Sequence, residues 1–142
     1  MNIKTFSKTL TGVALGCSIS LFSFADVVVI VHPSNEAALN IKIVKRIFLG
    51  KEKKFSDGKE VLPVNQVPSS GARGSFDTDT LGRSSTQIAA YWSKLVFTGK
   101  GIPPKELDND AAVLAIVADN PNAIGYVDRA SVSDAVKAVS LN

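Results

Sequence analysis

An uninterrupted run of β-branched residues near the start of the chain places the strongest limit on its fold. Residues 26–32 read Asp-Val-Val-Val-Ile-Val-His, with no alternation of apolar and polar side chains. A strand with one face in water alternates, whereas a strand covered on both faces does not. The run therefore predicts a strand inside a sheet that has helices packed on both sides.

Segments with helical periodicity alternate with further apolar runs along the rest of the chain. We expect helices over about residues 40–50, 73–81, 84–98 and 110–118, and a helical turn over 132–135. We expect further strands over residues 60–66, 123–127 and 136–141. Strands that alternate with helices predict an α/β domain with a mixed or mostly parallel sheet flanked by helices.

The first 25 residues have the pattern of a secretory signal peptide. A basic start without acidic residues precedes a largely apolar run over residues 9–24, too short to span a bilayer comfortably. Residues 23–25, Ser-Phe-Ala, have small side chains at both positions that signal peptidase reads. We therefore expect an exported, periplasmic chain with one domain over residues 26–142.

Cys17 gives an alternative reading of the same segment. It follows Ala-Leu-Gly, which loosely resembles a lipoprotein cleavage box, so lipid anchoring at Cys17 stays open beside cleavage before Asp26. Cys17 is the only cysteine of the chain. Cleavage before Asp26 would therefore leave a domain with neither a disulfide nor thiol chemistry.

The loop over residues 69–73, Ser-Ser-Gly-Ala-Arg, is the strongest candidate for a binding site. A small-residue loop between a strand and a helix leaves backbone N–H groups pointing the same way, and the helix dipole adds partial positive charge. Ser69 and Ser70 add hydroxyls, and Arg73 adds a guanidinium. The loop therefore predicts a site for a phosphate-like oxyanion. A plain strand-to-helix turn is the alternative, because Ser and Gly favour such turns on structural grounds alone.

Several separated segments, taken in order, resemble the periplasmic phosphate-binding proteins of ABC transporters. They are Val31-His-Pro-Ser-Asn35, Ile47-Phe-Leu-Gly-Lys51, Val61-Leu-Pro-Val64, Ser69-Ser-Gly-Ala-Arg73 with Phe76, and Ala123-Ile-Gly-Tyr-Val127. The resemblance covers nearly all of residues 26–142 but only one lobe of that family, the second. It implies a single periplasmic-binding-protein-like lobe. It also implies a site for phosphate or a related oxyanion, with these contacts: Ser69, Ser70, Gly71 and Arg73, and in second rank Ser34 and Asn35.

The chain departs from the family's phosphate loop at two places. The loop usually reads Ser-Gly-Thr, and here Ala72 takes the Thr position, which removes one hydroxyl donor. Asn65, Gln66 and Val67 stand where the family often has a charged residue. Arg73 is expected to compensate, because its planar fork suits an oxyanion. The family encloses phosphate between two lobes, so a single lobe predicts weak binding in a site open to water.

No pattern in the sequence is typical of an enzyme, a metal site or a nucleic-acid-binding protein, and we expect no cofactor. His32 is the only histidine, and no Gly-x-Ser-x-Gly elbow is present. Asp77 and Asp79 begin like a calcium loop, but later positions lack oxygen ligands, so both are expected to start a helix or to be exposed. Residues 26–142 carry 14 basic and 13 acidic side chains, a net charge of +1 that indicates no polyanion partner.

A lysine cluster and an apolar stripe are each expected to have a structural role and not a functional one. The lysines at 51, 53, 54 and 59 are expected to form a solvated face, with an acidic partner or lipid head groups as the alternative. The aromatic residues Tyr91, Trp92 and Phe97 lie at helical spacing, and Val96 joins the same apolar stripe. They are expected to belong to the core.

Two functions follow from these observations. The first is an exported solute-binding domain for phosphate or a related oxyanion, associated with an ABC permease. The alternative is a ligand-free interaction or sensor-input module that docks on a membrane transporter, a membrane sensor or a second copy of itself as a homodimer. Exposed apolar surface would favour the alternative.

Overall fold

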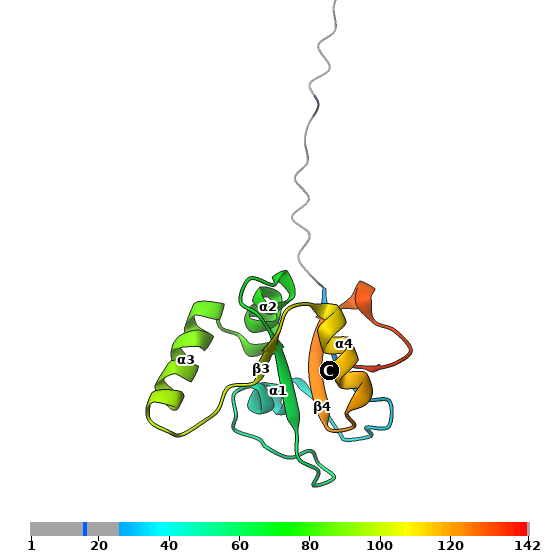
Figure 1. Cartoon of the computed structure of the whole chain (residues 1–142), viewed down its shortest axis with the longest axis horizontal. Coiled ribbons are helices and arrows are strands. Elements are labelled where there is room, and N and C mark those ends of the chain that lie inside the picture. The colour runs from blue at the N-terminus through cyan, green and yellow to red at the C-terminus, as the bar shows by residue number, and fades with distance from the viewer. Residues whose placement is uncertain (1–15, 17–25, 142) are drawn as a thin grey trace, which may run out of the picture.

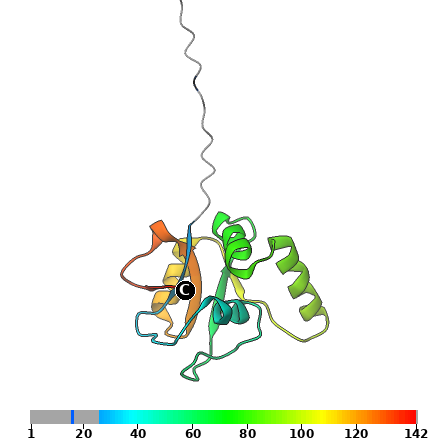
Figure 2. The same ribbon diagram turned by 180° about the vertical axis from the view of Figure 1, so that it is seen from behind.

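The computed structural model describes residue 16 and residues 26–141, so the predicted signal peptide and Cys17 lie outside the described residues. Figure 1 shows the described chain as a sheet with helices on both faces, and Figure 2 shows it from behind. The strands are β1 (Val27–Val31), β2 (Leu62–Gln66), β3 (Lys105–Leu107), β4 (Ala123–Asp128) and β5 (Lys137–Val139). The helices are α1 (Ile41–Phe48), α2 (Gly71–Ser75), α3 (Ser85–Phe97) and α4 (Asp110–Asp119), with a π-helix η1 (Phe76–Leu81) and a 3₁₀ turn η2 (Arg129–Ser131).

The sheet is mixed, with its strands in the order β3-β2-β4-β1-β5. β2 pairs in parallel with β3 and β4, whereas β1 pairs antiparallel with β4 and β5. The predicted α/β fold with a mixed sheet flanked by helices is confirmed. No helix in the described part of the chain is both long and apolar enough to cross a membrane.

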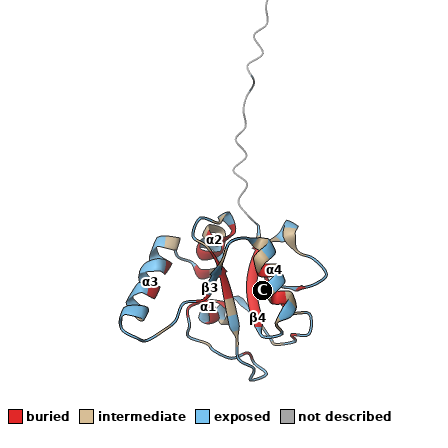
Figure 3. Cartoon of the chain, in the orientation of Figure 1, coloured by how far each residue is buried: buried red, intermediate tan, exposed pale blue. Residues whose placement is uncertain are grey.

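β1 is buried on both faces, as its unbroken apolar run predicts. Val29 and Val31 join the core beneath α1, η1 and α3, and Val28 and Ile30 join the core beneath α4. A β-strand directs successive side chains to opposite faces, so one strand of five apolar residues supplies both cores. Figure 3 shows buried residues concentrated on the sheet and on the helix surfaces that face it.

Aromatic packing joins α1 and η1 to the central strand β4. The rings of Phe76 and Tyr126 are stacked with centroids 3.9 Å apart, and Phe48 meets the Phe76 ring edge-on at 4.8 Å. All three side chains are fully or almost fully buried. This cluster fixes η1, and with it the end of α2, against the sheet.

The region after β2 differs from the helix predicted over residues 73–81. The helix begins two residues earlier, at Gly71, because Ser70 serves as its N-cap. It continues from Phe76 as a π-helix that ends at Gly82, whose φ of 72° is left-handed. Asp77 and Asp79 lie in the first turn of η1, as predicted for residues that start a helix, but Asp77 is fully buried whereas Asp79 is exposed.

The predicted apolar stripe of α3 is wrong at its C-terminal end. Trp92 is buried and Tyr91 is half-buried, but Val96 is 53% exposed and Phe97 is 92% exposed. α3 lies at the outer edge of the molecule (Figure 1), so only its sheet-facing residues are covered. The short strand β3 was not predicted, because Lys-Glu-Leu has no apolar alternation and its pairing with β2 forms only in the tertiary structure.

Candidate functional site

The predicted binding loop lies at the end of β2 and is exposed. Ser69 and Gly71 are exposed and Ser70 is half-buried. The Ser70 hydroxyl oxygen accepts a hydrogen bond from the Arg73 N–H at 3.4 Å and so caps α2. The N–H groups of Gly71 and Ala72 have no hydrogen-bond acceptor among the described residues. Within the described residues, the loop thus has two unpaired N–H groups, one of the exposed residue Gly71 and one of the buried residue Ala72.

Ser69 and Ser70 differ in what they can offer a ligand. The Ser70 hydroxyl donates to Gln66 Oε1 at 2.6 Å, so its proton is already used. The Ser69 hydroxyl makes no hydrogen bond with the rest of the described chain. Ser70 therefore shapes the loop, and Ser69 is the side chain that remains free to donate.

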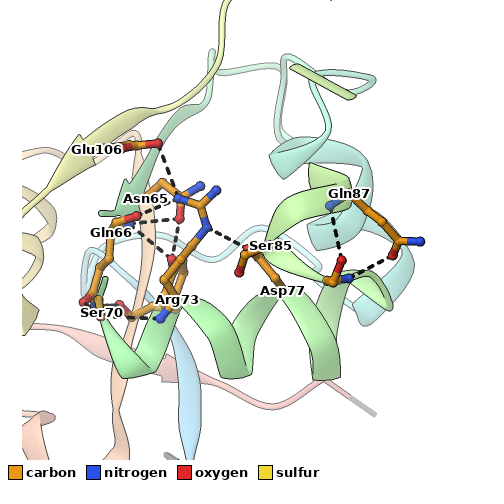
Figure 4. A network of polar contacts seen from close by, with 10 residues as sticks. Asn65, Gln66, Ser70, Arg73, Asp77, Ser85, Gln87 and Glu106 are labelled. Atoms are coloured by element: carbon orange, nitrogen blue, oxygen red, sulfur yellow. Dashed lines mark hydrogen bonds and ion pairs between the residues drawn. The ribbon is translucent and has the colours of Figure 1, made fainter. Parts of the chain in front are cut away.

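Arg73 points into the protein, where its charge is balanced. Its side chain is 4% exposed, and Nε donates to Asp77 Oδ2 at 2.8 Å (Figure 4). Nη1 donates to the Gln66 carbonyl at 2.7 Å and lies 3.4 Å from Glu106 Oε1. Burial acts to lower the pKa of Arg73, but the hydrogen bond and charge of Asp77 outweigh it, so the pKa is raised. This arrangement does not support the prediction that Arg73 neutralises a bound anion.

Asp77 is the functional-looking residue that sequence reasoning misjudged. Its carboxylate is fully buried, and Oδ2 accepts hydrogen bonds from Arg73 and from the Ser85 hydroxyl at 2.7 Å. Oδ1 has no partner in the described part of the chain. The spacing of Arg73 and Asp77, four residues apart in a helical segment, was the one sequence signal that could have indicated the pair.

A second buried network joins the end of β2 to β4. The Tyr126 hydroxyl accepts from the Gln66 N–H at 3.2 Å and donates to Asn65 Oδ1. Burial raises the pKa of Tyr126 above its ordinary value of 10.0. Gln66 Nε2 donates to Asp110 Oδ1 at 2.8 Å, which links the loop serine Ser70 to a carboxylate through one side chain.

Similar folds among solved structures identify the architecture; no family model matches the sequence. An ABC-type phosphate transport receptor from Vibrio cholerae matches with a TM-score of 0.64 and 19% identity, over 81% of this chain and 45% of that one. A putative phosphate ABC transporter substrate-binding protein with bound phosphate, from Clostridium perfringens, matches with a TM-score of 0.64 and 22% identity, over 81% and 44%. PstS from Borrelia burgdorferi matches with a TM-score of 0.59 and 13% identity, over 82% and 47%.

The fold is similar to one lobe of these solved structures. The chain spans less than half the length of the solved structures that it matches. The predicted resemblance to these proteins is thereby confirmed at the level of the fold. Identities of 13–22% leave the activity of the lobe to be argued from its own residues.

The second-rank contacts lie at the opposite end of the lobe from the loop. Val31, the last residue of β1, pairs with Ile124 near the start of β4, and Leu62, the first residue of β2, pairs with Ala123. β1 therefore ends where β2 begins, and Ser34 and Asn35, which follow β1, lie at that end. Ser69 and its neighbours follow the far end of β2 (Figure 1). The structure does not bring the two groups of predicted contacts together.

The residues at that opposite end have structural partners of their own. Nδ1 of His32 lies 2.7 Å from the Ser34 hydroxyl and accepts from the Ser34 N–H at 3.1 Å. Asn35 is buried, its side-chain oxygen accepts from the Ala37 N–H at 2.8 Å, and its carbonyl accepts from the Lys137 ammonium. These bonds close the turn after β1. Within the described residues, no group of three or more His, Cys, Asp and Glu side chains could hold a metal ion.

Proposed function

We propose that the lobe is a solute-binding domain that binds phosphate or a related oxyanion at the loop of residues 69–72. The observation that carries the proposal is the unpaired N–H of the exposed residue Gly71 next to the free hydroxyl of the exposed residue Ser69, with the unpaired N–H of the buried residue Ala72 behind them. An exposed cluster of donors at the start of a helical segment attracts a compact anion. The similar fold of phosphate receptors and the predicted export support a role in ABC phosphate transport outside the cytoplasm.

Arg73 acts in this proposal as a positioning residue. Its hydrogen bond to the Gln66 carbonyl holds the last residue of β2, and its ion pair with Asp77 holds η1. The loop that joins these two segments is thereby set in one conformation. Ser70 contributes in the same way, through its bonds to Gln66 and to the Arg73 N–H.

The proposed site is expected to bind an anion weakly. The described residues cover the loop from one side, so a bound anion faces water, and water screens each charge-assisted hydrogen bond. The Gln66 side chain, which accepts from the Ser70 hydroxyl, also donates to the Asp110 carboxylate. A negative charge therefore lies one side chain away from Ser70, which disfavours a bound anion. We expect millimolar affinity for phosphate or sulfate in the lobe alone, and tighter binding where another polypeptide covers the loop.

A glycine substitution tests the site with little risk to the fold. A Cβ built on Gly71 meets nothing within 4 Å, so Gly71→Ala is tolerated, yet the added methyl lies beside the N–H groups that would contact the anion. We expect phosphate to shift the amide resonances of residues 69–72 in the original chain and to shift them much less in Gly71→Ala. Nuclear magnetic resonance titration with phosphate and with sulfate measures both.

Matched controls separate this result from a general loss of structure. A Cβ on Gly74, three residues further along α2, also meets nothing within 4 Å, so Gly74→Ala makes the same chemical change away from the loop. Gly74→Ala and Ser34→Ala are both expected to titrate like the original chain. Resonance shifts that centre on Ser34 and Asn35, or that are the same in Gly71→Ala, would contradict the proposal.

A second candidate function is an interaction module that docks without a small ligand. The ion pair of Arg73 and Asp77 favours it, because the loop's own cation is already neutralised. So do Phe97 and Ile102, which are 92% and 90% exposed. A transporter, a sensor or a second copy of the chain would be the partner. Sedimentation over a range of concentrations tests the last of these, since a homodimer must dissociate on dilution.

A further inference from the structure

The C-terminal end of α3 and the loop after it form a protruding apolar surface, which we call the α3 tip. Phe97 and Ile102 are its most exposed members, and Val96 is 53% exposed. Figure 1 shows this end of α3 and the following loop at the outer edge of the molecule, away from the loop of residues 69–72. Val96 and Ile102 line the same groove, and exposed apolar side chains that form a continuous surface usually mark a contact site.

The surroundings of the α3 tip are cationic. Residues 93–105 contain three lysines, Lys94, Lys100 and Lys105, and no acidic residue. A groove of about 790 Å³ next to the tip is lined by Ile102, Val96 and Trp92 together with Lys51, Lys53 and Lys100. No carboxylate lines that groove. The one acidic residue within the lysine cluster of residues 51–54 is Glu52, which lies 4.0 Å from Arg46.

The shape of the tip distinguishes between two kinds of anionic partner. Phe97 lines neither the groove described above nor the neighbouring one that contains Glu52 and Lys54. An acidic peptide would occupy a groove and bury the residues inside it. A membrane surface instead receives side chains that project, while lysines around them meet the lipid phosphates. An exposed phenylalanine with an exposed lysine three residues before it and another three residues after it, Lys94 and Lys100, fits the second arrangement.

We propose that the α3 tip binds the surface of a membrane that contains anionic phospholipid, with Phe97 and Ile102 entering the interface and the surrounding lysines contacting head groups. This attachment is independent of anion binding at residues 69–72, which lie elsewhere on the lobe. It holds the domain at the membrane with its loop turned away from the lipid. It requires no membrane-spanning helix.

A reporter at position 97 tests the insertion directly. Ile41 is 44% exposed at the start of α1 and lines neither groove, so Ile41→Trp is the matched control for Phe97→Trp. With vesicles of phosphatidylglycerol and brominated lipid, we expect the added emission of Phe97→Trp to shift to the blue and to be quenched. The added emission of Ile41→Trp should stay unchanged. Because the readout is local, lipid binding by the apolar run of residues 9–24 does not mask it.

Vesicle co-sedimentation of the full chain measures how much the apolar and the basic side chains of the α3 tip each contribute to membrane binding. The measured quantity is the extra binding to vesicles with anionic lipid over vesicles without it. The Phe97→Ser/Ile102→Ser chain should show this extra binding weakened by roughly tenfold or more. Lys94→Gln and Lys100→Gln should each weaken it about fivefold, and added salt should weaken it further. Ile41→Ser and Lys42→Gln are controls of the same chemistry on α1, and both should bind like the original chain.

Three results of the vesicle experiments would overturn the proposal. They are unquenched emission from Phe97→Trp, equal binding to neutral phosphatidylcholine vesicles, and unaltered binding of the Phe97→Ser/Ile102→Ser chain. If poly-glutamate shifts the emission of Phe97→Trp to the blue and vesicles do not, the membrane proposal is overturned in favour of an acidic polypeptide partner. Quenched emission from Phe97→Trp would establish membrane attachment whether or not phosphate binds at residues 69–72, because the two sites lie apart and are measured separately.

Discussion

Arg73 is the residue whose role changes most between sequence and structure. A guanidinium next to a Ser-Gly loop predicts an anion contact, but here the group is buried and paired with Asp77. In the structure the guanidinium turns inward, to Asp77 and the Gln66 carbonyl. Sequence could not supply the direction, because it depends on Gln66 and Glu106 meeting Arg73 after β2 and β3 have paired.

Removal of the guanidinium should therefore appear as a loss of stability. In Arg73→Met the Asp77 carboxylate stays buried without its partner, and the cost of such a charge is about 3–5 kcal/mol. In Arg73→Met/Asp77→Met no buried charge remains, so the loss should be smaller than in the single variant. Urea denaturation measures both. A single variant as stable as the original chain would show that the pair carries no structural role.

Tyr126 should make the free energy of unfolding depend on pH in the alkaline range. Its phenol has a raised pKa in the folded chain, so the unfolded chain loses this proton first as the pH rises. The stabilisation is thus complete below about pH 10 and declines by about 1.4 kcal/mol for each pH unit above it, until the folded pKa is reached.

Tyr126→Phe isolates this contribution. The variant leaves the partners of the hydroxyl, Asn65 and the Gln66 N–H, less well satisfied, which costs about 1–3 kcal/mol near neutral pH. The alkaline decline in the free energy of unfolding should be shallower in the variant than in the original chain. Parallel declines in the two proteins would mean that Tyr126 titrates alike in the folded and unfolded states.

At the scale of elements, the position of α4 over the sheet depends on a glycine in β4. A Cβ at Gly125 would lie 2.6 Å from Val113 Cγ1 and 3.0 Å from Val64 Cγ2. α4 can approach β4 this closely only because the strand has no side chain there. The Ala-Ile-Gly-Tyr-Val segment is thus required for helix packing and not only for strand formation.

Gly125→Ala should therefore destabilise the fold by about 1–3 kcal/mol, because the new methyl group overpacks the core beneath α4. Gly74→Ala serves again as the control, since its Cβ meets nothing. Gly125→Ala combined with Val113→Ala should lose less stability than the two single changes added together, because the smaller residue makes room. Thermal denaturation of the original chain, the two single variants, the double variant and the Gly74→Ala control gives the comparison. Strict additivity of the two single changes would argue against the clash.

Elements that carry their own hydrophobic pattern were predictable. β1, β4 and α1 formed where their apolar residues indicated, since each buries a surface that its sequence displays. β3 was not predictable, and for residues 76–81 a helix was predicted but its π form was not, because neither feature has a local signature. β3 exists through its pairing with β2, and η1 through the burial of Phe76 and Asp77 beneath neighbouring elements.

At the scale of the whole molecule, the antiparallel direction of β1 decides which loops can share a site. The family-like segments around Ser34 and around Ser69 were expected to converge, and each lies where a strand ends, as predicted. They are separated because β1 runs opposite to β2 and β4. Strand direction is a property of the assembled sheet, so no single segment of the sequence encodes it.

The pairing of β1 also constrains the order in which the chain can fold. β1 is made first, yet its two neighbours, β4 and β5, come from residues 123–139, close to the end of the described chain. The five β-branched residues of β1 therefore have no strand partners until residues 123–139 have been made. Such late closure of distant contacts slows folding and leaves an aggregation-prone strand edge open. Until then the strand leaves an apolar segment exposed, which is the kind of segment that a chaperone can hold.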